Sequence, residues 1–275
     1  MHSVIIAFVS MGSFITTQAP VSTFRLPRGS IMKTIFASAL ILSCAFSAVA
    51  EDTRCYELRI YHAAPGKLDA LNARFREHSC ALLEKHGFTN VGYWVPVDNK
   101  DNLLIYVISS ASREAHDKAW KEFAADPAWK EVVKTTEANG KLVTKVDSIF
   151  LTATDFSPEM TVSANEPTRA FELRTYTPAD GKMDALLSRF RDHTVKLFEK
   201  YGMTNIAYWT STGVEKPQLI YILAHKSKED GLKSFGAFRV DPEWVEAKKT
   251  SEANGSLTEK VESLYMTPVD YSKMK

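Results

Sequence analysis

Two histidines, His78 and His193, are the residues of this chain best suited to chemistry. An imidazole can serve as a general base, a proton carrier, or a ligand for a metal or haem. On a regular helix, His78 would share the apolar stripe of Phe75 and Leu82. We therefore expect both histidines to face inward, into a cleft between a helix and a sheet. They are either core histidines held by one buried hydrogen bond, or residues that bind a small molecule or handle protons.

A charged strand occurs twice in the chain, as "ELRIY" at 57–61 and as "ELRTY" at 172–176. Strand alternation places the glutamate, arginine and tyrosine of each copy on one face and the apolar residues on the other. If Leu58 and Ile60 face the helices, the charged face points into the space between two sheets. We expect an Arg–Glu lattice there, because buried charges need partners. Binding of a small anion by the arginines is the alternative.

Repeated aromatic pairs end a later strand in each copy, as Tyr93-Trp94 and Tyr208-Trp209. Such residues are usually core, but neighbours on a strand point to opposite faces, so one of each pair can line a cleft. No catalytic residue is assigned. The candidate ligand-binding residues are His78, His193, Arg59, Arg174, Tyr61, Tyr176, Trp94 and Trp209.

These candidates recur because the chain contains an internal repeat. A shift of 115 residues aligns 54–156 with 169–271 without a gap, and 46 of the 103 pairs are identical. We expect a first domain at 51–156, a linker at 157–168 and a second domain at 169–275. Residues 1–50 form an upstream extension and a signal peptide.

Each repeat has the pattern β-α-β-β-α-β. In the first copy, strands are expected at 54–62, 88–95, 103–110 and 145–152, with a helix from Gly66 to Gly87. A second helical region begins at Ser112, restarts at Asp126-Pro127 and ends at Asn139-Gly140. This order predicts an α+β fold of the ferredoxin-like type, with both helices on one face of a four-stranded antiparallel sheet. The other face must pack on something, so we expect the two repeats to form one intrachain, pseudo-dimeric α+β barrel.

The N-terminal segment resembles a secretory signal peptide. Residues 32–50 contain a basic start, an apolar stretch and Ala48-Val49-Ala50 before Glu51, which predicts cleavage after Ala50 and export to the periplasm or the medium. A membrane anchor and a lipid attachment at Cys44 are the alternatives. An exported protein could pair Cys55 with Cys80 in a disulfide bond.

Several motifs in both repeats together resemble the NIPSNAP family of the dimeric α+β barrel superfamily. They are "ELRxY" on a strand, Gly66-Lys67 and Gly181-Lys182 before a helix, "DPAW" or "DPEW", and a closing Asp155-Phe156-Ser157-Pro158 or Asp270-Tyr271-Ser272. The resemblance covers almost all of 54–273. It implies the barrel fold and little about chemistry, although the superfamily includes small monooxygenases and haem-binding or haem-degrading enzymes.

Composition and absent motifs exclude several functions. The 34 basic and 33 acidic residues give no field for nucleic acid. The mature region has no phosphate loop, nucleophile elbow, CxxC pair or HExxH, so no metal or other cofactor is expected. We expect a small-molecule-binding or non-catalytic module, a monomer with an internal pseudo-two-fold or a higher homo-oligomer. A cofactor-poor monooxygenase or haem-associated enzyme using His78 or His193, and a protein-interaction scaffold, are the alternatives.

Overall fold

The two repeats fold with the same order of elements. The computed structural model describes residues 52–160 and 168–275, which belong to one compact unit. The expected signal peptide and most of the expected linker lie outside the described residues. The elements of the first repeat are β1 (Cys55–Ala63), α1 (Leu68–Arg74), the π-helix η1 (Phe75–Ser79), α2 (Cys80–Lys85), β2 (Thr89–Pro96), β3 (Leu103–Ser110), α3 (Arg113–Ala125), α4 (Pro127–Thr136) and β4 (Val143–Ala153). Those of the second are β5 (Ala170–Pro178), α5 (Met183–Arg189), the π-helix η2 (Phe190–Thr194), α6 (Val195–Lys200), β6 (Thr204–Thr212), β7 (Leu219–His225), α7 (Lys228–Arg239), α8 (Pro242–Ser251) and β8 (Thr258–Pro268).

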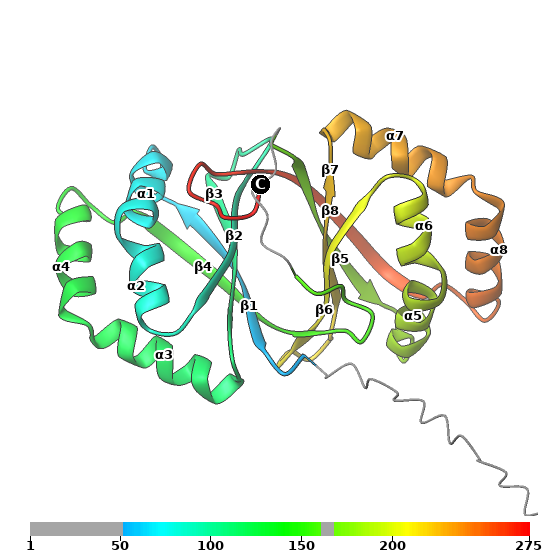
Figure 1. The fold of residues 1–275 in the computed structure, drawn as a ribbon, viewed down its shortest axis with the longest axis horizontal. Coiled ribbons are helices and arrows are strands. Elements are labelled where there is room, and N and C mark those ends of the chain that lie inside the picture. Colours follow the sequence, from blue (N-terminus) through cyan, green and yellow to red (C-terminus); the bar gives the residue numbers. More distant parts are fainter. Residues whose placement is uncertain (1–51, 161–167) are drawn as a thin grey trace, which may run out of the picture. The chain divides into compact units, whose positions relative to one another are not determined.

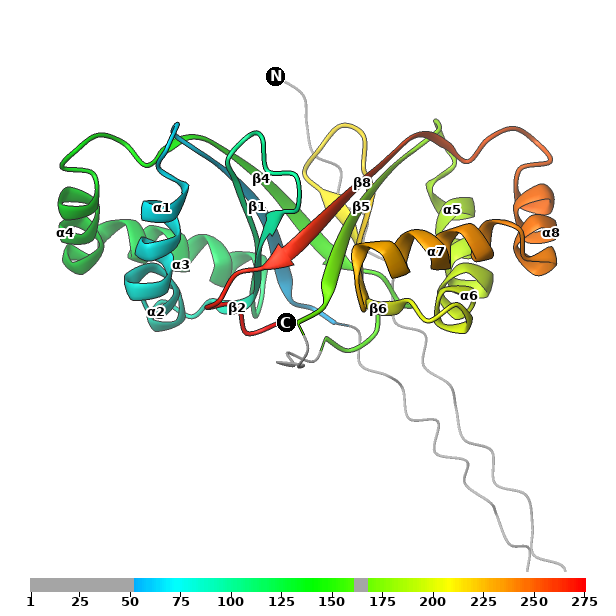
Figure 2. The same cartoon turned by 90° about the horizontal axis from the view of Figure 1, so that it is seen from above.

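The strands form one closed antiparallel barrel in the order β1-β3-β2-β8-β5-β7-β6-β4. Each repeat contributes four adjacent strands. The two sheets join where β2 pairs with β8 and where β4 pairs with β6. The helices of the two repeats cover opposite outer sides of this barrel (Figures 1 and 2). The predicted pseudo-dimeric α+β barrel is therefore confirmed.

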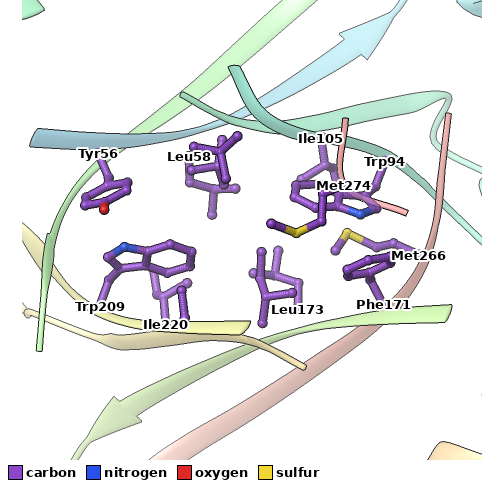
Figure 3. Close-up of a cluster of buried hydrophobic side chains, with 14 of the residues drawn as sticks. Tyr56, Leu58, Trp94, Ile105, Phe171, Leu173, Trp209, Ile220, Met266 and Met274 are labelled. Carbon is purple, nitrogen blue, oxygen red and sulfur yellow. The ribbon is translucent and has the colours of Figure 1, made fainter. Parts of the chain in front are cut away.

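The barrel interior is apolar (Figure 3). All eight strands supply buried side chains to it, and contacts such as Tyr56 with Trp209 and Trp94 with Phe171 cross between the repeats. Leu58 belongs to this interior and is 2% exposed. Our expectation that Leu58 faces the helices and that charge fills the barrel was wrong. The apolar faces meet because two bare sheets exclude water best with apolar side chains.

The closing motif of each repeat docks on the other repeat. Asp155, after β4, accepts two hydrogen bonds of 2.7 Å from Arg191 on η2, and Asp270 accepts the equivalent pair from Arg76 on η1. Two residues further on, the Ser272 hydroxyl accepts a hydrogen bond from the Tyr93 amide at 3.0 Å. The motif thus ties each strand end to the opposite helical layer.

The second helical region of each repeat breaks where the sequence predicts. Asp126 is the N-cap of α4 and accepts from the Ala128 amide at 2.8 Å, while Asp241 caps α8 in the same way. Pro127 and Pro242 follow at the first helical position, where a missing N–H costs nothing. Within the described residues, no helix has both the length and the apolar character needed to cross a membrane.

Candidate functional site

The charged face of β1 packs against helix α3. The buried Glu57 carboxylate accepts hydrogen bonds from Arg59 on its own strand, from Ser148 on β4, and at 2.8 Å each from His116 Nε2 and Trp120 Nε1 on α3. The Arg59 guanidinium lies 4.5 Å from the centre of the Trp120 ring. The ion pairs therefore lie within each repeat, and the expected lattice across the pseudo-two-fold does not form.

The second repeat builds the same cluster with a histidine from another element. Glu172 accepts from Arg174 and Ser263, and its remaining oxygen contacts His225 Nε2 at 3.0 Å. His225 ends strand β7, whereas His116 lies on helix α3. The residue equivalent to His116 is Gly231, and a Cβ there would lie only 3.0 Å from the His225 ring. One imidazole thus reaches the glutamate in each repeat, from two different chain positions.

The pKa values of the two glutamates follow from these contacts. Burial opposes ionisation of Glu57, but the His116 hydrogen bond, the Arg59 charge and the Ser148 and Trp120 hydrogen bonds lower its pKa to about 2. The pKa of Glu172 is lowered despite burial by His225, Arg174 and Ser263. Both carboxylates are therefore ionised at neutral pH, and every ionised oxygen is a hydrogen-bond acceptor.

His78 does not face the sheet, contrary to our expectation. Its side chain is 43% exposed and lies 3.9 Å from Glu77. The cause is the π-helix η1, which adds one residue to the turn and shifts the inward positions from 78 and 82 to Ser79 and Leu83. The same segment recurs as η2, where His193 is half-buried. His78 is therefore largely exposed, and His193 lies at the side of its helix that lines a groove toward α8.

A groove of about 630 Å³ lies beside His193, between α5–η2 and α8. Its base includes Arg189, whose side chain is 4% exposed, donates to Glu252 at 2.8 Å and lies 5.2 Å from the Trp244 ring centre. Ala185 and Ala247 contribute to its apolar wall, and Asp192, Glu243 and Glu246 line it with carboxylates. The groove lies between two helices, so the expected cleft between helix and sheet was wrong.

The other candidate residues are buried in packed layers. Trp94 and Trp209 lie inside the barrel, 0% and 1% exposed. Tyr61 and Tyr176 accompany the arginines on the helical side, where Arg174 donates to the Tyr176 hydroxyl at 3.1 Å and Tyr176 packs against Phe190. The eight candidates thus lie in three places: the barrel interior, the layer between sheet and helices, and the helix surface. Among them, the arginine and tyrosine of each repeat are in direct contact.

The cysteines and metal-ligand residues add no further site among the described residues. Cys55 and Cys80 are both free, so the proposed disulfide bond does not form. Burial raises the pKa of the Cys80 thiol to about 11, which makes it a poor nucleophile at neutral pH. No cluster of three or more His, Cys, Asp or Glu side chains in 52–160 and 168–275 could hold a metal ion.

This fold, a tandem α+β barrel with helices outside and a filled interior, defines the class of the protein. The chain belongs to the NIPSNAP family, whose model, described as NIPSNAP, matches residues 56–158 and 171–273. No curated protein matches the chain in sequence.

Several solved structures are similar to this chain. An anthrone oxidase-like protein is 15% identical with a TM-score of 0.53, over 82% of this chain and 95% of its own. A proposed monooxygenase from Lactobacillus acidophilus NCFM is 10% identical with a TM-score of 0.51, over 78% of this chain and 94% of its own. A NIPSNAP family protein from Agrobacterium tumefaciens is 24% identical with a TM-score of 0.35, over 38% and 97%. At these identities, the first two structures show a likeness in fold alone.

Sequence reasoning missed the residues that complete the buried clusters. At the 115-residue offset, Gly231 takes the place of His116, and His225 takes the place of Ser110. The second repeat lacks the histidine at position 231 and has one six residues earlier, at 225. This exchange was the signal in the sequence that each histidine contacts the equivalent glutamate of its repeat. The two positions reach the same carboxylate because α3 and α7 begin directly after β3 and β7.

Proposed function

We propose that this NIPSNAP protein is a non-catalytic module that binds a small molecule in the groove between α5–η2 and α8. The observation that carries the proposal is the groove itself, which has a volume typical of ligand sites and a half-buried histidine on its wall. It adjoins η2, and π-helical turns frequently occur at functional sites.

The lining of the groove indicates the chemistry of the ligand. Arg189 is already neutralised by Glu252, so it offers little to an anion. Asp192 and Glu243 have no ion pair among the described residues, and Glu246 has only an exposed lysine 3.9 Å away. Apolar walls with carboxylates at the rim favour an amphipathic cation, such as an aromatic amine. Glu243 is specific to the second repeat, because Ala128 occupies the equivalent position in the first.

A haem enzyme fits this structure less well. The layer between helices and sheet, where the superfamily resemblance would place haem, is filled in the second repeat by aromatic side chains that include Phe190, Phe198 and Tyr221. His78 is 43% exposed, and His193 lines the groove between α5–η2 and α8 instead of this layer. The residues present therefore do not fit a haem held between helix and sheet, and the oxygenase names of the structural relatives support no residue role here.

Binding of phenethylamine tests the proposed groove. We expect calorimetry to give a dissociation constant on the order of 1 mM, as suits so small a ligand. The anion 3-phenylpropionate, of similar shape, should bind at least roughly tenfold more weakly, because it meets carboxylates. Glu243→Ala should weaken phenethylamine binding roughly threefold to tenfold. Glu131→Ala, at the position in the first repeat that matches Glu246, is the control and should have no effect. Equal binding of amine and acid, or full binding by Glu243→Ala, would contradict the proposal.

We also propose that the protein is exported and cleaved after Ala50, on the basis of the signal-peptide pattern at 32–50. When the full chain is produced in a Gram-negative host, N-terminal sequencing of the periplasmic protein should begin at Glu51. A product that stays in the cytoplasm and retains Met1 or Met32 would refute this.

A further inference from the structure

A second groove lies in the helical layer of the second repeat, beside His225. It has a volume of about 300 Å³ and is formed by the turn after α6, the end of β7 and one side of α7. His225, Lys226, Lys233, Ser234 and Asp230 contribute to its lining. It shares no lining residue with the groove at His193.

The buried histidine of this groove is oriented by a carboxylate. His225 has a side chain only 1% exposed, and its Nε2 lies 3.0 Å from Glu172 Oε2. Since Glu172 is ionised, it can only accept, so Nε2 must carry the proton. A neutral imidazole that donates from Nε2 accepts at Nδ1. Among the described residues, nothing donates to Nδ1.

The first repeat provides a matched comparison in which the same imidazole is fully occupied. His116 Nε2 contacts Glu57, and its Nδ1 contacts the Ser110 hydroxyl at 3.1 Å. Ser110 occupies the position equivalent to His225. The neighbouring positions are also apolar in the first repeat, because Lys226, Asp230 and Ser234 correspond to Ala111, Ala115 and Ala119. The polar lining and the open ring nitrogen therefore occur together, in the second repeat.

The charges of the groove favour an anion. Lys226 and Lys233 form no ion pair with any described residue, while Asp230 accepts a hydrogen bond from Ser227 at 3.0 Å. Asp241 is neutralised by Lys200, and it also accepts a hydrogen bond of 2.6 Å from the hydroxyl of Tyr201, which lines the groove. The ammonium groups of Lys226 and Lys233 thus outnumber the one exposed carboxylate of Asp230, and the groove has a net positive charge.

We propose that this groove binds a small oxyanion that also carries a hydroxyl group, such as hydrogen phosphate or a 2-hydroxycarboxylate. The ammonium groups of Lys226 and Lys233 bind the anionic oxygens. The hydroxyl of the ligand donates to His225 Nδ1, which Glu172 holds in the accepting tautomer. An oxyanion without a hydroxyl cannot donate this hydrogen bond to His225 Nδ1.

Pairs of anions that differ in a hydroxyl group distinguish binding that depends on His225 from non-specific attraction of anions to the two lysines. Near pH 8, we expect inorganic phosphate to bind roughly tenfold more tightly than sulfate, and L-lactate roughly tenfold more tightly than propionate, because one buried hydrogen bond is lost in each second probe. Selectivity in the phosphate pair alone identifies a phosphate site, and in the lactate pair alone a hydroxy-acid site. Lys226→Ala/Lys233→Ala should abolish binding. Equal binding within both pairs, or no binding of phosphate and lactate, would overturn the proposal.

A triple variant places the residues of the first repeat at three positions of the second. It removes the acceptor, His225 Nδ1, and still gives Glu172 a histidine partner. His225→Ser/Gly231→His/Tyr265→Phe recreates the Ser110, His116 and Phe150 arrangement, and the third change clears the Tyr265 hydroxyl, which lies 2.8 Å from a Cβ at 231. It should stay folded and lose the selectivity for phosphate and lactate. Retained selectivity would overturn the role of His225. Lys118→Ala, equivalent to Lys233 in the first repeat, is the control and should change nothing.

Discussion

Trp94→Ala is expected to lower the free energy of unfolding by about 3–5 kcal/mol. Trp94 is 0% exposed inside the barrel, and its ring centre lies 5.5 Å from that of Phe171 in the other repeat. Its indole also covers Gly92, where a Cβ would lie 2.3 Å from the ring. The indole Nε1 has no hydrogen-bond partner, so the loss comes from packing and from the cavity that remains. Urea denaturation followed by far-UV circular dichroism measures the change.

Two further variants serve as controls for Trp94→Ala. Trp94→Phe fills part of the space and should cost clearly less than Trp94→Ala. His78→Ala removes a side chain that is 43% exposed and should change stability by no more than about 0.5 kcal/mol. A loss below about 1 kcal/mol for Trp94→Ala would mean that the barrel interior is not a close-packed core.

Glu57→Ala is expected to destabilise the protein by a similar amount, about 3–5 kcal/mol, for an electrostatic reason. The substitution leaves Arg59, His116 and Trp120 without their shared acceptor, and Glu57 is 1% exposed, so water does not readily replace it. Glu172→Ala should destabilise the protein somewhat less. Phe235 occupies the position of Trp120 in the second repeat, so no indole N–H loses its acceptor there. Glu77→Ala, whose side chain is 61% exposed, is the control.

The same glutamate predicts a pH dependence. Its folded pKa of about 2 lies below the ordinary value of 4.5, so its contribution is complete above about pH 4.5 and is lost as the pH falls toward 2. Unfolding midpoints measured between pH 6 and pH 2 should fall more steeply for the wild type than for Glu57→Ala. Parallel profiles would show that the Glu57 carboxylate is not linked to folding.

Much of the fold followed from the sequence because the repeat doubles every signal. Asp126-Pro127 and Asp241-Pro242 marked the same helix start, and the strands were found within one or two residues of their observed bounds. The face of β1 was predicted wrongly, because alternation separates the residues into two sets but does not say which set faces the helices. That choice depends on His116 and Trp120, 59 and 63 residues away from Glu57 along the chain.

The candidate sites were less predictable, for two physical reasons. A helical stripe assumes 3.6 residues per turn, and the π-helix breaks this rule at the very turn that contains His78 or His193. The clusters around Glu57 and Glu172 also take their histidine from positions that are not equivalent in the two repeats. Ser110 with His116 and His225 with Gly231 are equivalent only when β3, α3, β7 and α7 are seen in space.

A ligand bound in the helical layer of the second repeat should leave the structural barrel interior undisturbed. Mapping of phenethylamine binding by amide chemical shifts tests it most directly. We expect changes at 188–194 and 243–247, with the indole N–H signals of Trp94 and Trp209 unmoved. Shifts of those indole signals, or equal shifts at 73–79 in the first repeat, would contradict it.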